Sequence, residues 1–127
     1  MITVMIEKKR DELGVYVAGH AGYAQKGADI VCAGASMLFD ALAAGCESLG
    51  AVTGYSAQNG RAQLTFRRDD RTEAGLHFFR AGILRLCERY PDHVGFVREK
   101  NESDSDKMDE TEVSPASYIS SVTPNES

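Results

Sequence analysis

His20 and Cys32 are the two residues whose types and spacing could do covalent chemistry, and they lie at the ends of the segment HAGYAQKGADIVC. A thiolate attacks carbonyl carbons well, and an imidazole can generate it by taking the thiol proton. The span between them contains Gly22 and Gly27 and few bulky apolar side chains. We therefore expect a flexible loop that doubles back and brings the imidazole and the thiol together.

The elements around this pair should help to activate the thiol. The apolar spacing predicts a helix over residues 30–49, with Asp29 as its N-cap. The Asp29 carboxylate could also orient His20, although capping alone would explain this residue. Cys32 would then lie in the first helical turn, where the helix dipole favours a thiolate and unpaired N–H groups could bind an oxyanion. Ser36 lies one turn beyond Cys32, where it could either hydrogen-bond within the site or pack the helix against a sheet.

The rest of the chain alternates between strand and helix patterns. Asn59-Gly60 is a strong hairpin signal between two short strands, and Pro91 should end the second helix. The predicted elements are strands at 2–8 and 13–20, the helix at 30–49, strands at 52–58 and 61–66, a helix opening at Thr72 and Glu73, and a strand at 93–98. This ββαββαβ order predicts an α+β fold in which two helices cover one mixed sheet.

Composition predicts one domain and an acidic tail. Residues 1–100 carry 13 Lys and Arg against 12 Asp and Glu, whereas residues 101–127 carry one against seven. The net charge of −5 therefore combines a tail at −6 with a body near +1. The tail is poor in large apolar groups, and we expect it to be disordered. No apolar stretch looks long enough to span a bilayer, and the N-terminus does not resemble a secretory signal, so we expect a cytoplasmic protein.

The other polar and sulfur-bearing residues have structural explanations. Cys46 and Cys87 fall within helices, where free cysteines usually pack as small hydrophobes. His77 and His93 are expected to be surface or core residues, and the arginines of the second half to form a solvated face. His20 and Cys32 could instead be metal ligands completed by Cys46, Cys87 or His77, although no second close pair supports a metal site.

The segment GHAGYAQKGADIVCAGAS, residues 19–36, resembles the signature of the ribosomal-processing cysteine protease family, Prp. The resemblance is carried by Gly19-His20-Ala21, Gly27, Asp29-Ile30-Val31-Cys32-Ala33 and Ser36, at the family's own His-to-Cys distance. The opening MITV and the order of elements extend the resemblance over residues 1 to about 98, leaving the acidic tail outside it.

The resemblance implies a cysteine endopeptidase that removes an N-terminal extension from large-subunit ribosomal protein twenty-seven. His20 would be the base and Cys32 the nucleophile, with Gly19, Asp29 and Ser36 supporting the site. It also implies a homodimer and a mobile loop between His20 and Cys32, and it requires no cofactor, metal, membrane or nucleic acid. Two alternatives stay open: a cysteine hydrolase of another acyl bond, and a noncatalytic ribosome-associated or RNA-binding regulator.

Overall fold

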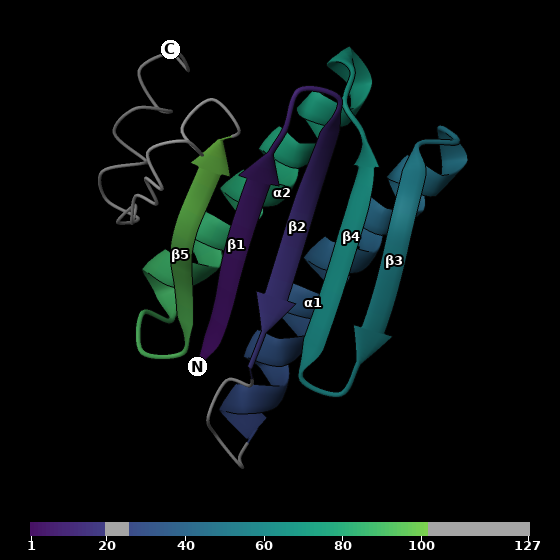
Figure 1. Ribbon diagram of the computed structural model, residues 1–127. Coiled ribbons are helices and arrows are strands. Elements are labelled where there is room, and N and C mark those ends of the chain that lie inside the picture. The colour runs from purple at the N-terminus through teal and green to yellow at the C-terminus, as the bar shows by residue number, and fades with distance from the viewer. Residues whose placement is uncertain (20–25, 102–127) are drawn as a thin grey trace.

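The structure, a computed structural model, describes residues 1–19 and 26–101 and has the predicted order ββαββαβ (Figure 1). Within these residues the expected α+β class is confirmed, and each predicted strand and helix is present. The elements are β1 (Ile2–Lys8), β2 (Glu12–Ala18), α1 (Lys26–Ser48), β3 (Val52–Gln58), β4 (Arg61–Arg67), α2 (Asp70–Arg89) and β5 (Val94–Asn101).

The strands form one mixed sheet in the order β3-β4-β2-β1-β5. β1 pairs with β5 in parallel, whereas the other neighbours are antiparallel. Both helices lie on the same face of this sheet (Figure 1). In the described part of the chain the fold therefore has two layers, and neither α1 nor α2 covers the other face of the sheet.

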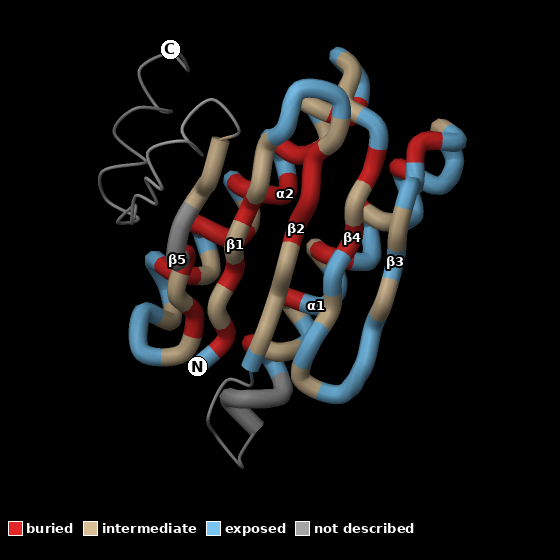
Figure 2. Tube along the Cα trace, viewed as in Figure 1, coloured by how far each residue is buried: buried red, intermediate tan, exposed pale blue. Residues whose placement is uncertain are grey.

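The core lies between the sheet and the two helices. Alternate residues of β1 are buried, as the period-two pattern predicts, and Figure 2 shows buried segments in β1, β2 and β4. β3 lies at an edge of the sheet and contains no buried residue. The largest fully buried side chains are Phe66, Ile6, Leu13, Leu64, Leu76 and Ile83.

Helix α1 begins at Lys26, four residues before the predicted start. The prediction that Asp29 caps this helix is therefore wrong, since Asp29 lies inside it. Lys26 and Ala28 are good helix formers, and an acidic residue in the first turn is favoured by the helix dipole. Gly27 is likewise part of the helix and not of the predicted loop.

Helix α1 is also more apolar than we expected from the sequence. The stretch Ile30–Ser48 has a mean hydropathy of 1.5 and is long and apolar enough, by length and composition only, to cross a membrane. The expectation that no such stretch exists is therefore wrong. Here one side of α1 packs on the sheet, with Val31, Ala35 and Phe39 buried, but only 28% of the stretch is buried.

Helix α2 begins with a capping box. The Asp69 side chain accepts hydrogen bonds from the backbone N–H groups of Arg71 and Thr72, and Thr72 Oγ1 accepts one from the Asp69 N–H at 2.9 Å. The hydrogen bond from the Thr72 N–H, with further help from the Arg67 side chain and the Arg71 N–H, holds the pKa of the Asp69 carboxyl below its usual value. The helix thus starts two residues before the predicted Thr72.

Arg80 departs from the predicted solvated face of arginines. It is buried, with 8% of its surface exposed, and its Nη2 lies 2.7 Å from Glu99 Oε2 on β5. Lys8 Nζ lies 3.3 Å from the same carboxylate oxygen. A charged cluster therefore joins α2 to the parallel pair of β1 and β5.

The predicted acidic tail falls almost entirely outside the described residues. β5 continues to Asn101, one residue beyond the boundary predicted at residue 100. Disorder of residues 102–127 stays a prediction.

Candidate active site

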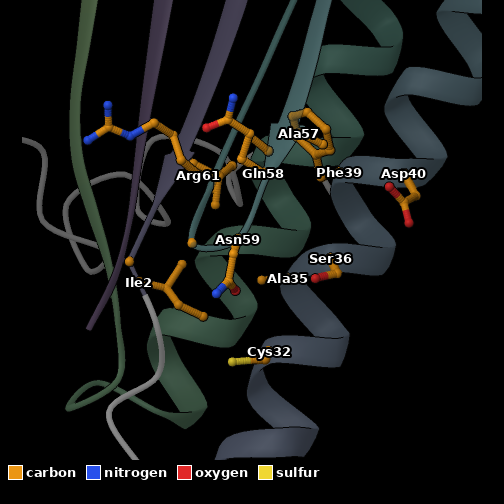
Figure 3. A pocket seen from close by; sticks show the side chains of 14 residues that line it. Ile2, Cys32, Ala35, Ser36, Phe39, Asp40, Ala57, Gln58, Asn59 and Arg61 are labelled. Atoms are coloured by element: carbon orange, nitrogen blue, oxygen red, sulfur yellow. The ribbon is translucent and has the colours of Figure 1, made fainter.

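Cys32 lies on the wall of an open groove of about 480 Å³ between α1 and the β3–β4 hairpin (Figure 3). The thiol is half-buried and its sulfur points into the groove. The floor and walls are apolar near Ile2, Val17 and Phe39 and polar toward the hairpin turn. An extended peptide could therefore approach Cys32 from solvent.

Gly19 lines the same groove and directly follows the last residue of β2, immediately before His20. Its φ of +98° is a conformation that side chains disfavour, and a Cβ there would overlap the Met1 carbonyl oxygen. Its N–H donates a 2.8 Å hydrogen bond to the Gly60 carbonyl of the hairpin turn. Glycine is thus required here, and its position is fixed relative to the groove.

His20 and Gly22 lie outside the described residues. The His20–Cys32 pair therefore stays a prediction. The described neighbour, Gly19, nevertheless brings the chain to the groove immediately before His20. Asp29 is described only by its backbone, in the first turn of α1.

The early start of α1 changes how its backbone could assist Cys32. Cys32 is seventh in the helix, so it lies in the second turn, not the first as predicted. In an α-helix, only the first four N–H groups lack an intrahelical acceptor, and the dipole effect falls off within the first turn. The Cys32 N–H is therefore paired within the helix, and the predicted oxyanion site at this position is not supported.

Ser36 is exposed and lines the groove one helical turn after Cys32. Of the two explanations for this residue, packing of the helix against the sheet does not fit, because its side chain is not covered. A hydroxyl near the thiol remains available to a bound substrate.

The other two thiols are buried, as predicted. Cys46 and Cys87 are 2% and 1% exposed, and burial raises the pKa of both. That of Cys46 reaches about 11, with a smaller contribution from the Asp69 carboxylate. Among the described residues, no three His, Cys, Asp or Glu side chains are grouped to hold a metal ion, and His77 is exposed on α2.

The sequence did not indicate that the β3–β4 turn forms the opposite wall of the site. Gln58, Asn59 and Arg61 line the groove together with Asp40 of α1. Figure 3 shows the Asn59 side chain pointing into the groove, whereas the charged ends of Arg61 and Asp40 point away. The Asn-Gly pair was visible in the sequence, but it indicated only a turn, because sheet register determines what the turn faces.

A family model described as cysteine protease Prp matches residues 1–95 of the chain. The chain belongs to this family. The match contains His20 and Cys32 as well as the turn at Asn59, and it ends within β5. A Prp member is a cysteine protease, which identifies the groove beside Cys32 as the candidate active site.

Solved structures share this fold. A protein from Streptococcus mutans, SMU.848, is 27% identical, with a TM-score of 0.61 over 80% of this chain and 93% of its own. Two structures of the ribosomal processing protease Prp from S. aureus, one with a covalently linked product peptide and one with a substrate peptide, are 24% and 23% identical. Their TM-scores are 0.63 and 0.62, over 80% of this chain and 100% of theirs. No curated protein matches the chain.

Proposed function

We propose that this protein is a cysteine endopeptidase in which Cys32 is the nucleophile and His20 the base. The observation that supports it best is the position of Cys32. It is the partly exposed thiol of the three, and it opens onto a groove that is also lined by Gly19, the residue before His20 in the sequence. Family membership supports cysteine protease chemistry in general.

The proposed reaction has two steps. The Cys32 thiolate attacks the scissile carbonyl, and the resulting tetrahedral intermediate collapses when protonated His20 gives its proton to the leaving amine. This breaks the peptide C–N bond and leaves a thioester on Cys32. His20 then takes a proton from water, whose oxygen attacks the thioester and releases the acid and the thiol.

The proposed substrate is the precursor of large-subunit ribosomal protein twenty-seven, from which an N-terminal extension is removed. The S. aureus relatives support this class, since they are ribosomal processing proteases solved with peptides. An open groove that exposes Cys32 suits an extended segment better than a folded domain. Such processing would take place in the cytoplasm.

The test is cleavage of the purified precursor, followed by mass spectrometry. Cys32→Ala and His20→Ala should each abolish cleavage while leaving the circular dichroism spectrum unchanged. Cys46→Ala and His77→Ala, matched changes away from the groove, should retain activity. Full processing by Cys32→Ala would refute the proposal, and cleavage of other acyl compounds but not of the precursor would favour a different cysteine hydrolase.

We further propose that the protein forms a homodimer through the outer faces of its two helices. Phe78 of α2 and Met37 of α1 are 73% and 65% exposed, and Phe78 borders an apolar depression of about 270 Å³ together with Ala41, one turn after Met37. Exposed apolar patches of this kind mark association surfaces.

Sedimentation velocity tests the dimer. The double change Met37→Glu with Phe78→Glu should yield monomers, whereas Gln63→Glu, on the uncovered face of the sheet, should leave the dimer intact. A wild-type protein that sediments as a monomer at micromolar concentration would contradict the proposed dimer but would not affect the proposed protease function.

A further inference from the structure

Attack on a carbonyl creates a negatively charged oxygen, and the groove must supply hydrogen-bond donors for it. The backbone around Cys32 does not, because α1 begins at Lys26 and the N–H of Cys32 is used within the helix. Among the described residues, we therefore look for a donor on another element that faces Cys32. Within the described residues, the β3–β4 turn is the element that stands opposite α1 across the groove (Figure 3).

Asn59 is the residue of this turn that is placed for the task. Its side chain points into the groove on the side where the Cys32 sulfur lies. Its amide is exposed and makes no hydrogen bond to another described residue. The amide N–H groups are thus available to a bound substrate.

The turn that carries Asn59 is held in place by the sheet. Gln58 and Arg61 pair across the two-residue turn, Gly60 adopts a φ of +80°, and the Gly60 carbonyl accepts the N–H of Gly19. The backbone of Asn59 is therefore fixed relative to Gly19, the residue that precedes His20. Donors that are oriented before the reaction stabilise a developing charge without a reorganisation cost.

The neighbouring polar groups are less suitable donors. The charged ends of Arg61 and Asp40 point away from the groove, and a carboxylate would repel an oxyanion. Ser36 lies on the same helix as Cys32 and presents a single O–H donor, whereas the planar amide of Asn59, on the opposite wall, presents two N–H donors.

We propose that Asn59 is a further catalytic residue whose side-chain Nδ2–H donates a hydrogen bond to the oxyanion formed when Cys32 attacks the scissile carbonyl. This inference depends on the proposed protease function. Asn59 forms no covalent bond and transfers no proton; its hydrogen bond strengthens as negative charge accumulates on the oxygen. The effect should therefore appear in kcat and not in KM.

The test compares two substitutions that preserve the turn. Gly-Gly and Asp-Gly are, like Asn-Gly, preferred hairpin pairs, so Asn59→Gly and Asn59→Asp should fold normally. Asn59→Gly should lower kcat about 100- to 1000-fold, the loss seen when one side-chain oxyanion donor is removed from another protease, with KM changed little. Asn59→Asp should lower kcat by at least the same factor, because its carboxylate repels the oxyanion.

Two controls separate this role from others. Gln63→Glu, which also replaces an amide by a carboxylate but on the uncovered face of the same hairpin, should keep wild-type kcat. Alkylation of Cys32 by iodoacetamide forms no oxyanion, so its rate should be the same in Asn59→Gly and wild type. A slowed alkylation would overturn the oxyanion role in favour of an effect on the thiol itself.

The remaining outcomes distinguish the two proposals. An active wild type with unchanged kcat in Asn59→Gly would refute the role of Asn59 while the protease function stands. A raised KM at constant kcat would likewise refute it, making Asn59 a ground-state substrate contact. A wild-type protein that does not cleave the precursor would refute the protease function first.

Discussion

Gly19 shows how one residue without a side chain can determine the geometry of the site. Replacement by Ala forces a Cβ toward the Met1 carbonyl oxygen at a φ of +98°. We expect Gly19→Ala to lower the free energy of unfolding by at least about 1–3 kcal/mol. Cleavage should fall as well, because His20 follows directly.

Urea denaturation measures this effect, and Gly45→Ala provides the matched control. A Cβ at Gly45, inside α1, meets nothing within 4 Å. That change should raise stability by about 0.5–1 kcal/mol, since Ala is the better helix former. Equal stability of Gly19→Ala and wild type would contradict the close approach to Met1.

The three thiols should differ sharply in accessibility. Cys46 and Cys87 are buried and their pKa values are raised, so at pH 8 both stay protonated and shielded, whereas Cys32 opens onto the groove. Brief treatment with iodoacetamide at pH 8 should therefore modify Cys32 alone, and all three thiols in urea. Peptide mapping checks this; native modification of Cys46 would show that α1 opens from the sheet.

The start of α2 depends on one buried hydroxyl, that of Thr72. Thr72 Oγ1 donates to the Arg67 carbonyl at 2.8 Å and accepts from the Asp69 N–H. Thr72→Val keeps the shape but leaves both backbone groups without this partner, which should cost about 1–3 kcal/mol. Thr72→Ser retains both hydrogen bonds and should cost less; a reversed order in thermal or urea unfolding would contradict the capping explanation.

The elements themselves were largely predictable, because they depend on local patterns. Alternation in β1 and the Asn59-Gly60 turn specify a strand and a hairpin whatever surrounds them. The start of α1 was not predictable, since an aspartate is as favourable inside the first turn of a helix as it is at the N-cap. The part played by Asn59 in the groove could not be predicted either, because it depends on which strand β4 pairs with.

The position of Arg80 was predictable from the sequence, but its partner was not. Leu76, Phe79, Arg80 and Ile83 follow the helical period of the buried face, so the spacing already placed this arginine toward the sheet. Its partner Glu99 lies on β5, after the helix has ended, and no local pattern connects the two. Long-range contacts of this kind require the assembled sheet.

The ion pair between Arg80 and Glu99 couples β5 to the rest of the described fold. Arg80 and Lys8 both contact Glu99, which unites α2, β1 and β5. Glu99→Gln removes the carboxylate charge from a buried guanidinium and should destabilise the protein by about 3–5 kcal/mol. Replacing both partners, as Arg80→Met with Glu99→Leu, should restore much of that loss.

An exposed pair offers the comparison. Glu88 lies 3.8 Å from Arg85 on the surface of α2, and Glu88→Gln should change stability by no more than about 1 kcal/mol. Both changes can be followed by urea denaturation. A smaller loss for Glu99→Gln than for Glu88→Gln would show that the buried cluster does not hold β5 in place.

Asn59 directly precedes a glycine in an exposed turn, and this makes the groove subject to chemical ageing. In such pairs the unhindered glycine nitrogen can attack the preceding side-chain carbonyl, expel ammonia and leave, after hydrolysis, an aspartate or isoaspartate. Stored protein should therefore lose activity in step with deamidation at this turn, as peptide mass spectrometry can follow. The lifetime of the working enzyme would then be limited by a single amide.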